Sequence, residues 1–240
     1  PIFVVTVILI PVIYPVASST SYGILWAIRT SAMVSIRRQE GSYDLIRIAP
    51  GGAWQAFWGV CAGCVHRNGD LDRLEVYTRR ILTMLLTLAL FTFFAGLLLP
   101  TERLQSELIT TSLVLLTVIG LTMIEFVQSP ILSTLIGMTF AVYARTTSDT
   151  RIGAFIGYVT VQILTYLTSV VLLTSFIIPT IERADMSQIT GVLFGCLWLV
   201  TYFVVFREVM LFALWRLISR RLNTDVTEMR YLLVDHWIIS

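Results

Sequence analysis

Long runs of apolar residues, separated by shorter polar stretches, make up most of this chain. A membrane-spanning helix needs about 20 mostly apolar residues, and five runs are long enough. The pattern therefore predicts an all-α fold, a polytopic transmembrane helix bundle over residues 1–240 as a single domain. The predicted spans are Pro1–Ile28, Ile81–Leu99, Leu108–Val127, Ile152–Ile178 and Ile189–Phe206.

Prolines complicate two parts of this pattern. Pro11 and Pro15 predict a kink in the first span. The stretch Ile131–Tyr143 has only 13 residues, too few to cross unless it merges with Leu108–Val127 through Pro130. We interpret it as a separate helix that lies at the membrane interface or is buried in the bundle.

Composition supports a lipid environment. Apolar residues make up 56% of the chain and charged residues 13%, against about 25% charged in a soluble domain. An ordinary soluble enzyme is therefore disfavoured. All 17 basic residues are arginines, but the net charge is only +2 and no arginine run exceeds two, so we expect no nucleic-acid partner.

Arginine placement predicts the orientation, because short loops rich in basic residues stay in the cytoplasm. The segment 29–80, the loop after the third span and the tail 207–240 are rich in arginine. The loops around Arg103 and Arg183 are poor in it. We therefore expect the N-terminal end outside and the C-terminal tail inside, in the plasma membrane of a prokaryotic cell.

One cytoplasmic stretch, Ser35–Pro50, resembles the cytoplasmic loop of ABC-2-type transporter permeases. The family pattern reads roughly Arg-Glu-x-Gly-Thr-x-Glu-x-Leu-Leu-x-Thr-Pro. Gln39, Ser42 and Ala49 depart from it. The positions that match in register are Arg38, Gly41, Asp44, Leu45, Ile46 and Pro50.

The resemblance implies a partner. In that family the loop lies between the second and third of six spans and docks on a cytoplasmic ATPase subunit. Pro1–Ile28 would then be the second span, with the first preceding Pro1. This chain has no P-loop of its own, so energy from ATP would have to come from another chain. We expect a permease-like subunit that is not itself an enzyme.

Two other interpretations stay open. The 38–50 stretch can instead be a connector that packs on its own bundle and contacts no partner. The whole chain can be a non-catalytic structural or accessory subunit of a larger membrane complex, such as a respiratory or photosynthetic electron-transfer assembly.

A second cytoplasmic stretch, Ala53–Val65, has the spacing of a single helical face. The pattern predicts an amphipathic helix in the headgroup plane, where tryptophan is enriched. The residues of this face are Trp54, Phe57, Trp58, Cys61 and Cys64.

Cofactor chemistry finds little support. Haem attachment needs Cys-x-x-Cys-His, and His66 stands one position too far from Cys64. A zinc site needs about four ligands, and only Asp70 or Asp72 could complete the set with Cys61, Cys64 and His66. We expect neither metal nor other cofactor, and membrane lipids as surroundings.

Glu125 is the only acidic residue inside a predicted span. Such acids are costly in lipid, and usually face the bundle interior or water. One interpretation is a substrate or proton site. The favoured one is a helix-end carboxylate that reaches the interface or pairs with an arginine such as Arg145. Arg207, Glu208 and Arg216 resemble interfacial anchors.

The predicted topology places Asp70 and Asp235 on the same, cytoplasmic side. We expect single cysteines at these two positions, in a cysteine-free background, to react with an impermeant maleimide from the same face. Labelling from opposite faces would contradict the five-span orientation.

Overall fold

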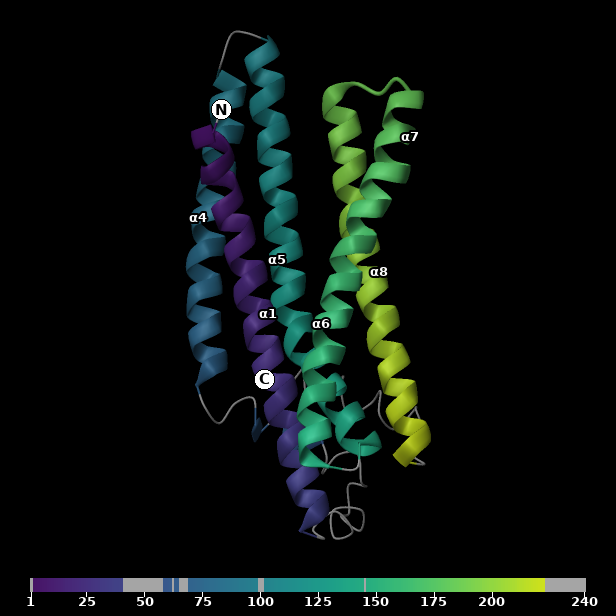
Figure 1. The fold of residues 1–240 in the computed structure, drawn as a ribbon. Helices are drawn as coiled ribbons and strands as arrows, with labels where there is room; N and C mark the ends of the chain where they lie inside the picture. Colours follow the sequence, from purple (N-terminus) through teal and green to yellow (C-terminus); the bar gives the residue numbers. More distant parts are fainter. Residues whose placement is uncertain are drawn as a thin grey trace. The chain divides into compact units, whose positions relative to one another are not determined.

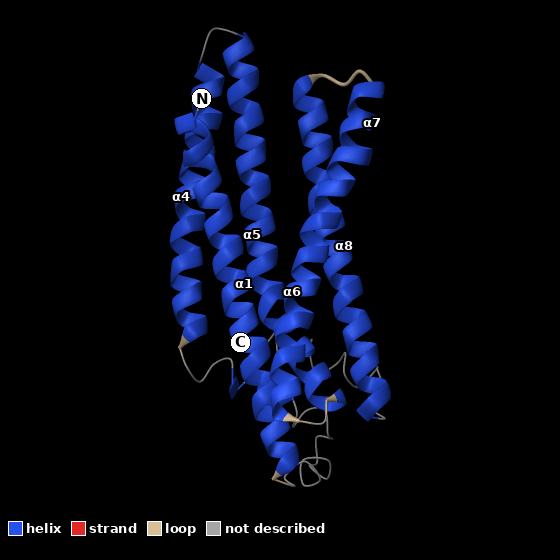
Figure 2. Ribbon diagram, viewed as in Figure 1, coloured by secondary structure: helices blue, strands red, loops and turns tan. Residues whose placement is uncertain are grey.

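Helices form all the regular structure in the part of the chain that the computed structural model describes, which is residues 2–40, 58–61, 63–64, 69–98, 102–144 and 146–222 (Figures 1 and 2). The all-helical prediction is confirmed. The elements with their bounds are α1 (Ile2–Gln39), α4 (Asp70–Leu98), α5 (Glu102–Tyr143), α6 (Thr147–Leu172), the π-helix η1 (Leu173–Ile177), α7 (Ile178–Arg183) and α8 (Gln188–Leu222).

Four of the described stretches are long and apolar enough to cross a membrane: Glu75–Leu98, Leu104–Tyr143, Thr147–Arg183 and Gln188–Arg221. The first predicted span falls in α1, which is not among these four. Large apolar side chains are exposed along the candidate spans, for example Met84 at 75% and Phe91 at 70%. Meanwhile Arg207 is fully buried. This distribution suits lipid as the surrounding solvent.

The chain divides into two compact units, and each division falls inside a helix. Unit 1 combines residues 1–19, 72–128 and 162–207, and unit 2 combines residues 20–71, 129–161 and 208–240. In unit 1, Leu85 and Ala89 of α4 pack with Leu115 of α5 in a small apolar cluster. Unit 2 has a larger core, which includes Leu135, Tyr158 and Trp215.

The prediction of a separate helix at Ile131–Tyr143 is wrong. This stretch continues Leu108–Val127 in one 42-residue helix, α5, with Pro130 inside it. The hydroxyls of Ser133 and Thr134 donate to the Pro130 carbonyl, at 2.9 and 2.7 Å. These are ordinary back-bonds of helical serine and threonine, and the carbonyl that loses its N–H partner to the proline is that of Phe126, four residues earlier. Residues 132–139 are all buried, which agrees with the second of the two predicted positions, burial in the bundle.

Several predicted loops are also shorter than expected, because the helices continue beyond the apolar runs. α1 extends to Gln39 and α4 begins at Asp70, so the connection replacing the predicted 29–80 segment is much shorter. α8 continues to Leu222 in place of a tail from residue 207. At about 1.5 Å per residue, α5 is about 60 Å long, twice the ~30 Å of bilayer hydrocarbon.

The candidate span Thr147–Arg183 changes from an α-helix to a π-helix shortly before Pro179. Residues Leu173–Ile177 form a π-helix, and the Ile178 N–H bonds to the Leu173 carbonyl. Pro179 follows at the start of α7 and has no N–H to donate. The predicted external loop from Pro179 to Gln188 is therefore partly helical, and its non-helical part is residues 184–187.

α1 and α5 approach closely at Gly137 in unit 2. A Cβ at this position would lie 2.7 Å from the Ala27 carbonyl oxygen and 3.2 Å from the Ser31 nitrogen. Both are backbone atoms, which cannot move aside cheaply. At Gly120 on the same helix a Cβ would meet nothing within 4 Å.

We expect Gly137→Ala to lower the free energy of unfolding by about 1–3 kcal/mol, the usual cost of overpacking. Gly120→Ala is the matched control and should be neutral or stabilising by up to about 1 kcal/mol, because alanine favours helix over glycine. Unfolding in a mild detergent measures both. Equal effects of the two substitutions would contradict the close approach.

Candidate functional site: a buried polar cluster around Glu125

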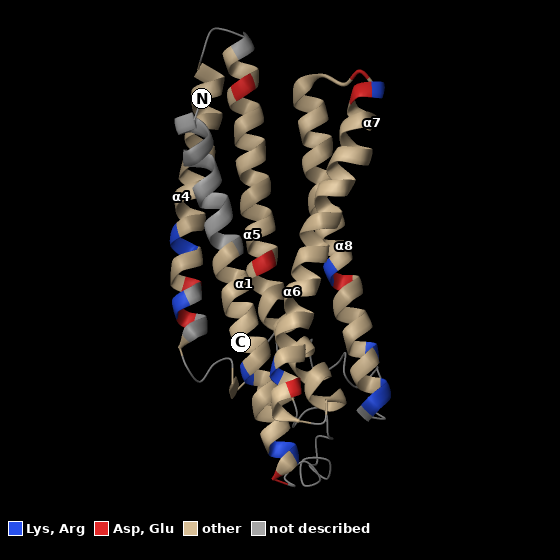
Figure 3. Ribbon diagram, viewed as in Figure 1, with Lys and Arg blue, Asp and Glu red and all other residues tan. Residues whose placement is uncertain are grey.

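Glu125 lies well inside α5, and its side chain is buried, with 3% of the residue exposed. The helix continues for many residues beyond it, to Tyr143. Charged residues are sparse along the middle of α5 and α8 (Figure 3). A lone carboxylate in such surroundings would be costly, so its partners decide what the position can do.

Three helices supply partners for this carboxylate, all within unit 1. Arg207 of α8 forms an ion pair with it, in which Nη2 donates to Oε2. Gln162 of α6 donates from Nε2 to Oε1 at 2.8 Å, and Ser19 of α1 donates from Oγ to the same oxygen at 3.3 Å. Both carboxylate oxygens are therefore hydrogen-bonded.

Two of the residues that bond to Glu125, Arg207 and Gln162, are also hydrogen-bonded to each other. Arg207 Nη2 donates to Gln162 Oε1 at 2.8 Å, so the amide accepts from the guanidinium and donates to the carboxylate. This fixes which way the amide points. The Arg207 Cζ lies 5.1 Å from the centre of the Phe203 ring, one turn earlier on α8. A cation over an aromatic face is a further favourable contact where water is excluded.

Among the described residues, both hydrogen bonds of Arg207 are donated by the same nitrogen atom, Nη2. Its Nε and Nη1 atoms are buried and have no hydrogen-bond partner among the described residues. An unsatisfied donor on a buried charged group is costly. Within the described part of the chain, the N–H groups of Arg207 Nε and Nη1 can therefore still donate hydrogen bonds, whereas Nη2 already donates to Glu125 and Gln162.

Two interpretations from the sequence are corrected here. Glu125 is not a helix-end carboxylate, because α5 continues through it. The predicted pairing with an arginine is confirmed, and that arginine is Arg207. Arg207 is not an interfacial anchor, because it is fully buried in the middle of α8. Arg145, the partner suggested from the sequence, lies outside the described residues.

Sequence reasoning missed Gln162 and Ser19 altogether. Gln162 is the only amide side chain in the predicted span Ile152–Ile178, which is a usable signal. Amide side chains often bond across helices in membranes. Ser19 is one of a run of hydroxyl residues at 18–21, and nothing in the sequence distinguishes it from its neighbours.

The predicted docking stretch is described only at its start. Arg38 lies in the last turn of α1, and its Nη1 donates to the carbonyls of Val142 at 3.2 Å and of Ala141 and Ala144 at 3.5 Å. These carbonyls are at the C-terminal end of α5, where a cation is favourable. Gly41, Asp44, Leu45, Ile46 and Pro50 lie outside the described residues.

The predicted interface helix is described in part. Residues 58–61 and 63–64 are helical, whereas Trp54 and Phe57 lie outside the described residues. Cys61 is fully buried in the core of unit 2, and Trp58 packs against that core. This part of the predicted face therefore contacts protein, and a position in the headgroup plane stays a prediction.

Metal chemistry at this cysteine pair has little physical support. Burial, and secondarily the neighbouring Cys64, raises the pKa of the Cys61 thiol well above its ordinary value. The thiolate is the form that ligates metal, so a raised pKa disfavours it. Both cysteines carry free thiols, and His66 lies outside the described residues.

Comparison with known proteins yields no match. No family model matches the chain, nor does any curated protein or solved structure.

Because each charge of the Glu125–Arg207 pair is buried, removing either one leaves the other uncompensated. We expect Glu125→Gln and Arg207→Met each to lower the free energy of unfolding by about 3–5 kcal/mol. The double variant should cost much less than the sum, since neither charge remains. Unfolding in detergent measures this double-mutant cycle.

Glu107→Gln is the matched control. Glu107 is an exposed acid on the same helix, so its loss should change stability by less than about 1 kcal/mol. Strictly additive effects of Glu125→Gln and Arg207→Met would show that the two side chains do not interact.

Proposed function

We propose that this chain is a permease-like membrane subunit that works with a separate cytoplasmic ATPase, docked on the 38–50 stretch. The attachment of Arg38 carries the proposal. The stretch that resembles the ABC-2 loop begins at this residue, and Arg38 is bonded to the end of α5 through three carbonyls. A partner bound to the stretch would therefore act on a point where two long helices are joined.

A second contact supports the same junction. The hydroxyl of Ser35 on α1 is hydrogen-bonded to that of Thr147 at 3.1 Å, where α6 begins. The last turns of α1 are thus bonded to α5 and to α6 within unit 2. Displacement of the docked stretch would be transmitted to both helices rather than absorbed by a loose connection.

In this proposal, the side chains around Glu125 exchange hydrogen-bond partners during transport. The Glu125 cluster joins side chains from α1, α5, α6 and α8 through a few polar contacts. Polar contacts between helices are discrete and can exchange partners, which allows the cluster a second arrangement. Arg207, whose buried Nε and Nη1 atoms have no hydrogen-bond partner in the described part of the chain, is the member able to bond to a new partner.

A structural, accessory role is the second candidate, and one observation favours it. Both oxygens of Glu125 are already bonded by Arg207, Gln162 and Ser19. A carboxylate in this state offers nothing to a substrate unless the cluster rearranges. In a larger assembly the same cluster would serve only to hold the helices together.

The permease role and the accessory role predict different protein subunits bound to this chain. Purification from native membranes in mild detergent, followed by mass spectrometry, should recover a chain with a P-loop and ATPase activity at a fixed ratio. Recovery with redox subunits, or with no ATPase, would favour the accessory role.

The docking stretch can be tested with Leu45→Ser/Ile46→Ser. Apolar side chains of this size contribute about 1.5–3 kcal/mol each when fully buried, so their loss should release a docked partner. We expect the variant to lose the ATPase on purification while its own melting temperature stays unchanged.

Val34→Ser is the matched control for packing within the chain. Val34 is 3% exposed in the core of unit 2, so its replacement should lower the melting temperature of the isolated chain. If Leu45→Ser/Ile46→Ser behaves like Val34→Ser and retains the partner, the stretch packs on its own bundle and docking is excluded.

A further inference from the structure

Arg207 has buried N–H groups to which no described residue bonds. Its guanidinium is planar and carries five N–H donors. Nη2 has two of them and donates to Glu125 Oε2 and, at 2.8 Å, to Gln162 Oε1. Nε and Nη1 carry the other three, and both atoms are buried without a hydrogen-bond partner among the described residues. A fully buried cation therefore still requires acceptors on two of its three nitrogens.

The missing partner is an acceptor rather than a negative charge. Glu125 already compensates the formal charge of Arg207 through the ion pair. A second anion would bring an uncompensated negative charge among apolar helices, which is costly. An uncharged oxygen atom meets the hydrogen-bond requirement without this cost.

The flat shape of the guanidinium places this acceptor. All its N–H groups lie in one plane, in a fixed fork geometry. The N–H of Nε is parallel to one N–H of Nη2, and one N–H of Nη1 is parallel to the other. An acceptor bonded to Nε or Nη1 on these edges therefore lies beside an oxygen to which Nη2 already donates, Glu125 Oε2 or Gln162 Oε1.

These neighbouring oxygens restrict the ligand further, because both are acceptors. Oxygen atoms of two different groups repel each other at this distance unless one of them carries a hydrogen that it can donate. A carboxylate, phosphate or carbonyl oxygen carries none. Water can accept from Arg207 and donate to the neighbouring oxygen, and buried water typically makes about three such bonds to otherwise unsatisfied groups.

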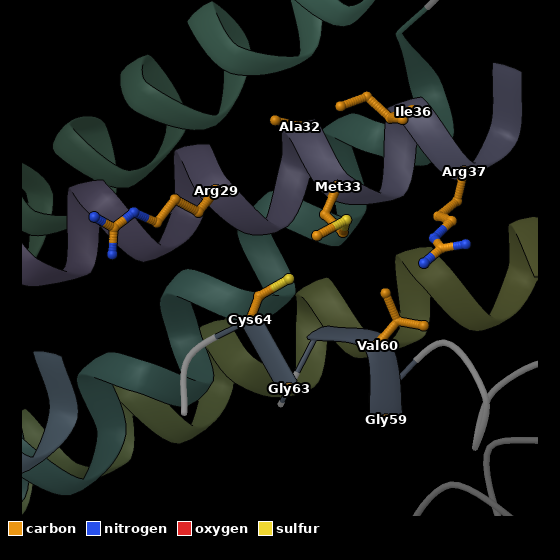
Figure 4. A pocket seen from close by; sticks show the side chains of 9 residues that line it. All are labelled: Arg29, Ala32, Met33, Ile36, Arg37, Gly59, Val60, Gly63 and Cys64. Atoms are coloured by element: carbon orange, nitrogen blue, oxygen red, sulfur yellow. The ribbon is translucent and has the colours of Figure 1, made fainter. Parts of the chain in front are cut away.

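The surroundings of the guanidinium favour a ligand of this size. Nε and Nη1 lie in the protein interior, and the centre of the Phe203 ring is 5.1 Å from Cζ. By contrast, the cavity in Figure 4 measures about 640 Å³, and its lining residues, among them Met33 and Cys64, belong to unit 2. No residue of the Glu125 cluster lines that cavity, so a ligand bound there would not supply the acceptor for Arg207.

We propose that internal water is a member of the Glu125 cluster. A water molecule accepts a hydrogen bond from Nε or Nη1 of Arg207 and donates one to Glu125 Oε2 or Gln162 Oε1. The inference does not depend on the proposed ATPase partner. It bears on the exchange of partners in the cluster, because each charged group can keep a hydrogen bond to water while the ion pair separates.

Nuclear Overhauser spectroscopy of the full chain in nanodiscs tests this proposal. In the rotating frame, direct contact between water and an N–H group gives a cross-peak of opposite sign to that of chemical exchange. With isotope-labelled arginine, we expect a contact cross-peak between water and the Nε or Nη1 protons of Arg207. Exchange with bulk solvent should be slow there, because the water is enclosed.

Arg216 is the matched control, because it is exposed on the same helix and should give exchange cross-peaks. Two independent routes identify the signals of Arg207. They should be absent from Glu125→Gln/Arg207→Met, in which neither charge is left unpaired. They should also show contacts with the Phe203 ring in the unaltered chain, so the test stands even if the variant fails to fold.

Three results would overturn the proposal. They are no contact cross-peak between water and Arg207, exchange as rapid at Arg207 as at Arg216, and contacts from the Nε and Nη1 protons to a further protein group in place of water. The second would mean that the site is open to bulk solvent. The third would mean that a protein group supplies the missing acceptor.

Discussion

The ion pair between Glu125 and Arg207 is the constraint on which the arrangement of unit 1 depends. Neither charge can be left alone among apolar helices, because the desolvation cost of an unpaired ion exceeds any packing gain. In lipid, helices gain no hydrophobic driving force from meeting, since lipid tails are as apolar as leucine, so close packing and interhelical hydrogen bonds decide which faces meet. In unit 1 the polar cluster supplies such hydrogen bonds. It requires that one face each of α1, α5, α6 and α8 turn toward the same point.

Unit 2 is held together by a different means. Its helices pack through a continuous apolar core, and at Gly137 the backbones of α1 and α5 come into direct contact. Small residues at helix interfaces allow this approach in membranes. Polar bonds then secure particular points, such as the 2.6 Å bond between the hydroxyls of Ser129 and Tyr158. Arg38 adds a charged bond at the end of α5.

The sequence was sufficient for the helical fold and for most helix positions, because long apolar runs are a strong signal. It failed on where helices end. α1 continues beyond its apolar run through mostly buried residues as far as Ser35, and α8 through alternately buried and exposed residues, whereas the continuation of α5 is itself apolar. The merging of Ile131–Tyr143 with the preceding helix depended on Pro130 being accommodated inside α5, and a proline in a sequence more often indicates the end of a helix.

The sequence was sufficient to identify Glu125 as a candidate site residue but not to identify the residues that bond to it. Glu125 was evident, as an acid in an apolar run, but its partner was assigned by proximity in the sequence. Arg207 was placed at the end of a span because the hydropathy falls there, and the structure shows that it is fully buried in the middle of α8. Pairing between residues 82 positions apart is a property of the tertiary fold, which no local pattern contains.

The most direct test of this account is a distance measurement in lipid bilayers by solid-state NMR. Carbon–nitrogen dipolar coupling between the Glu125 carboxylate and the Arg207 guanidinium, assigned by its absence in Glu125→Gln, reports the contact itself. The account predicts a coupling typical of direct hydrogen bonding, and a guanidinium protected from exchange with water. No coupling, together with rapid exchange at Arg207, would contradict it.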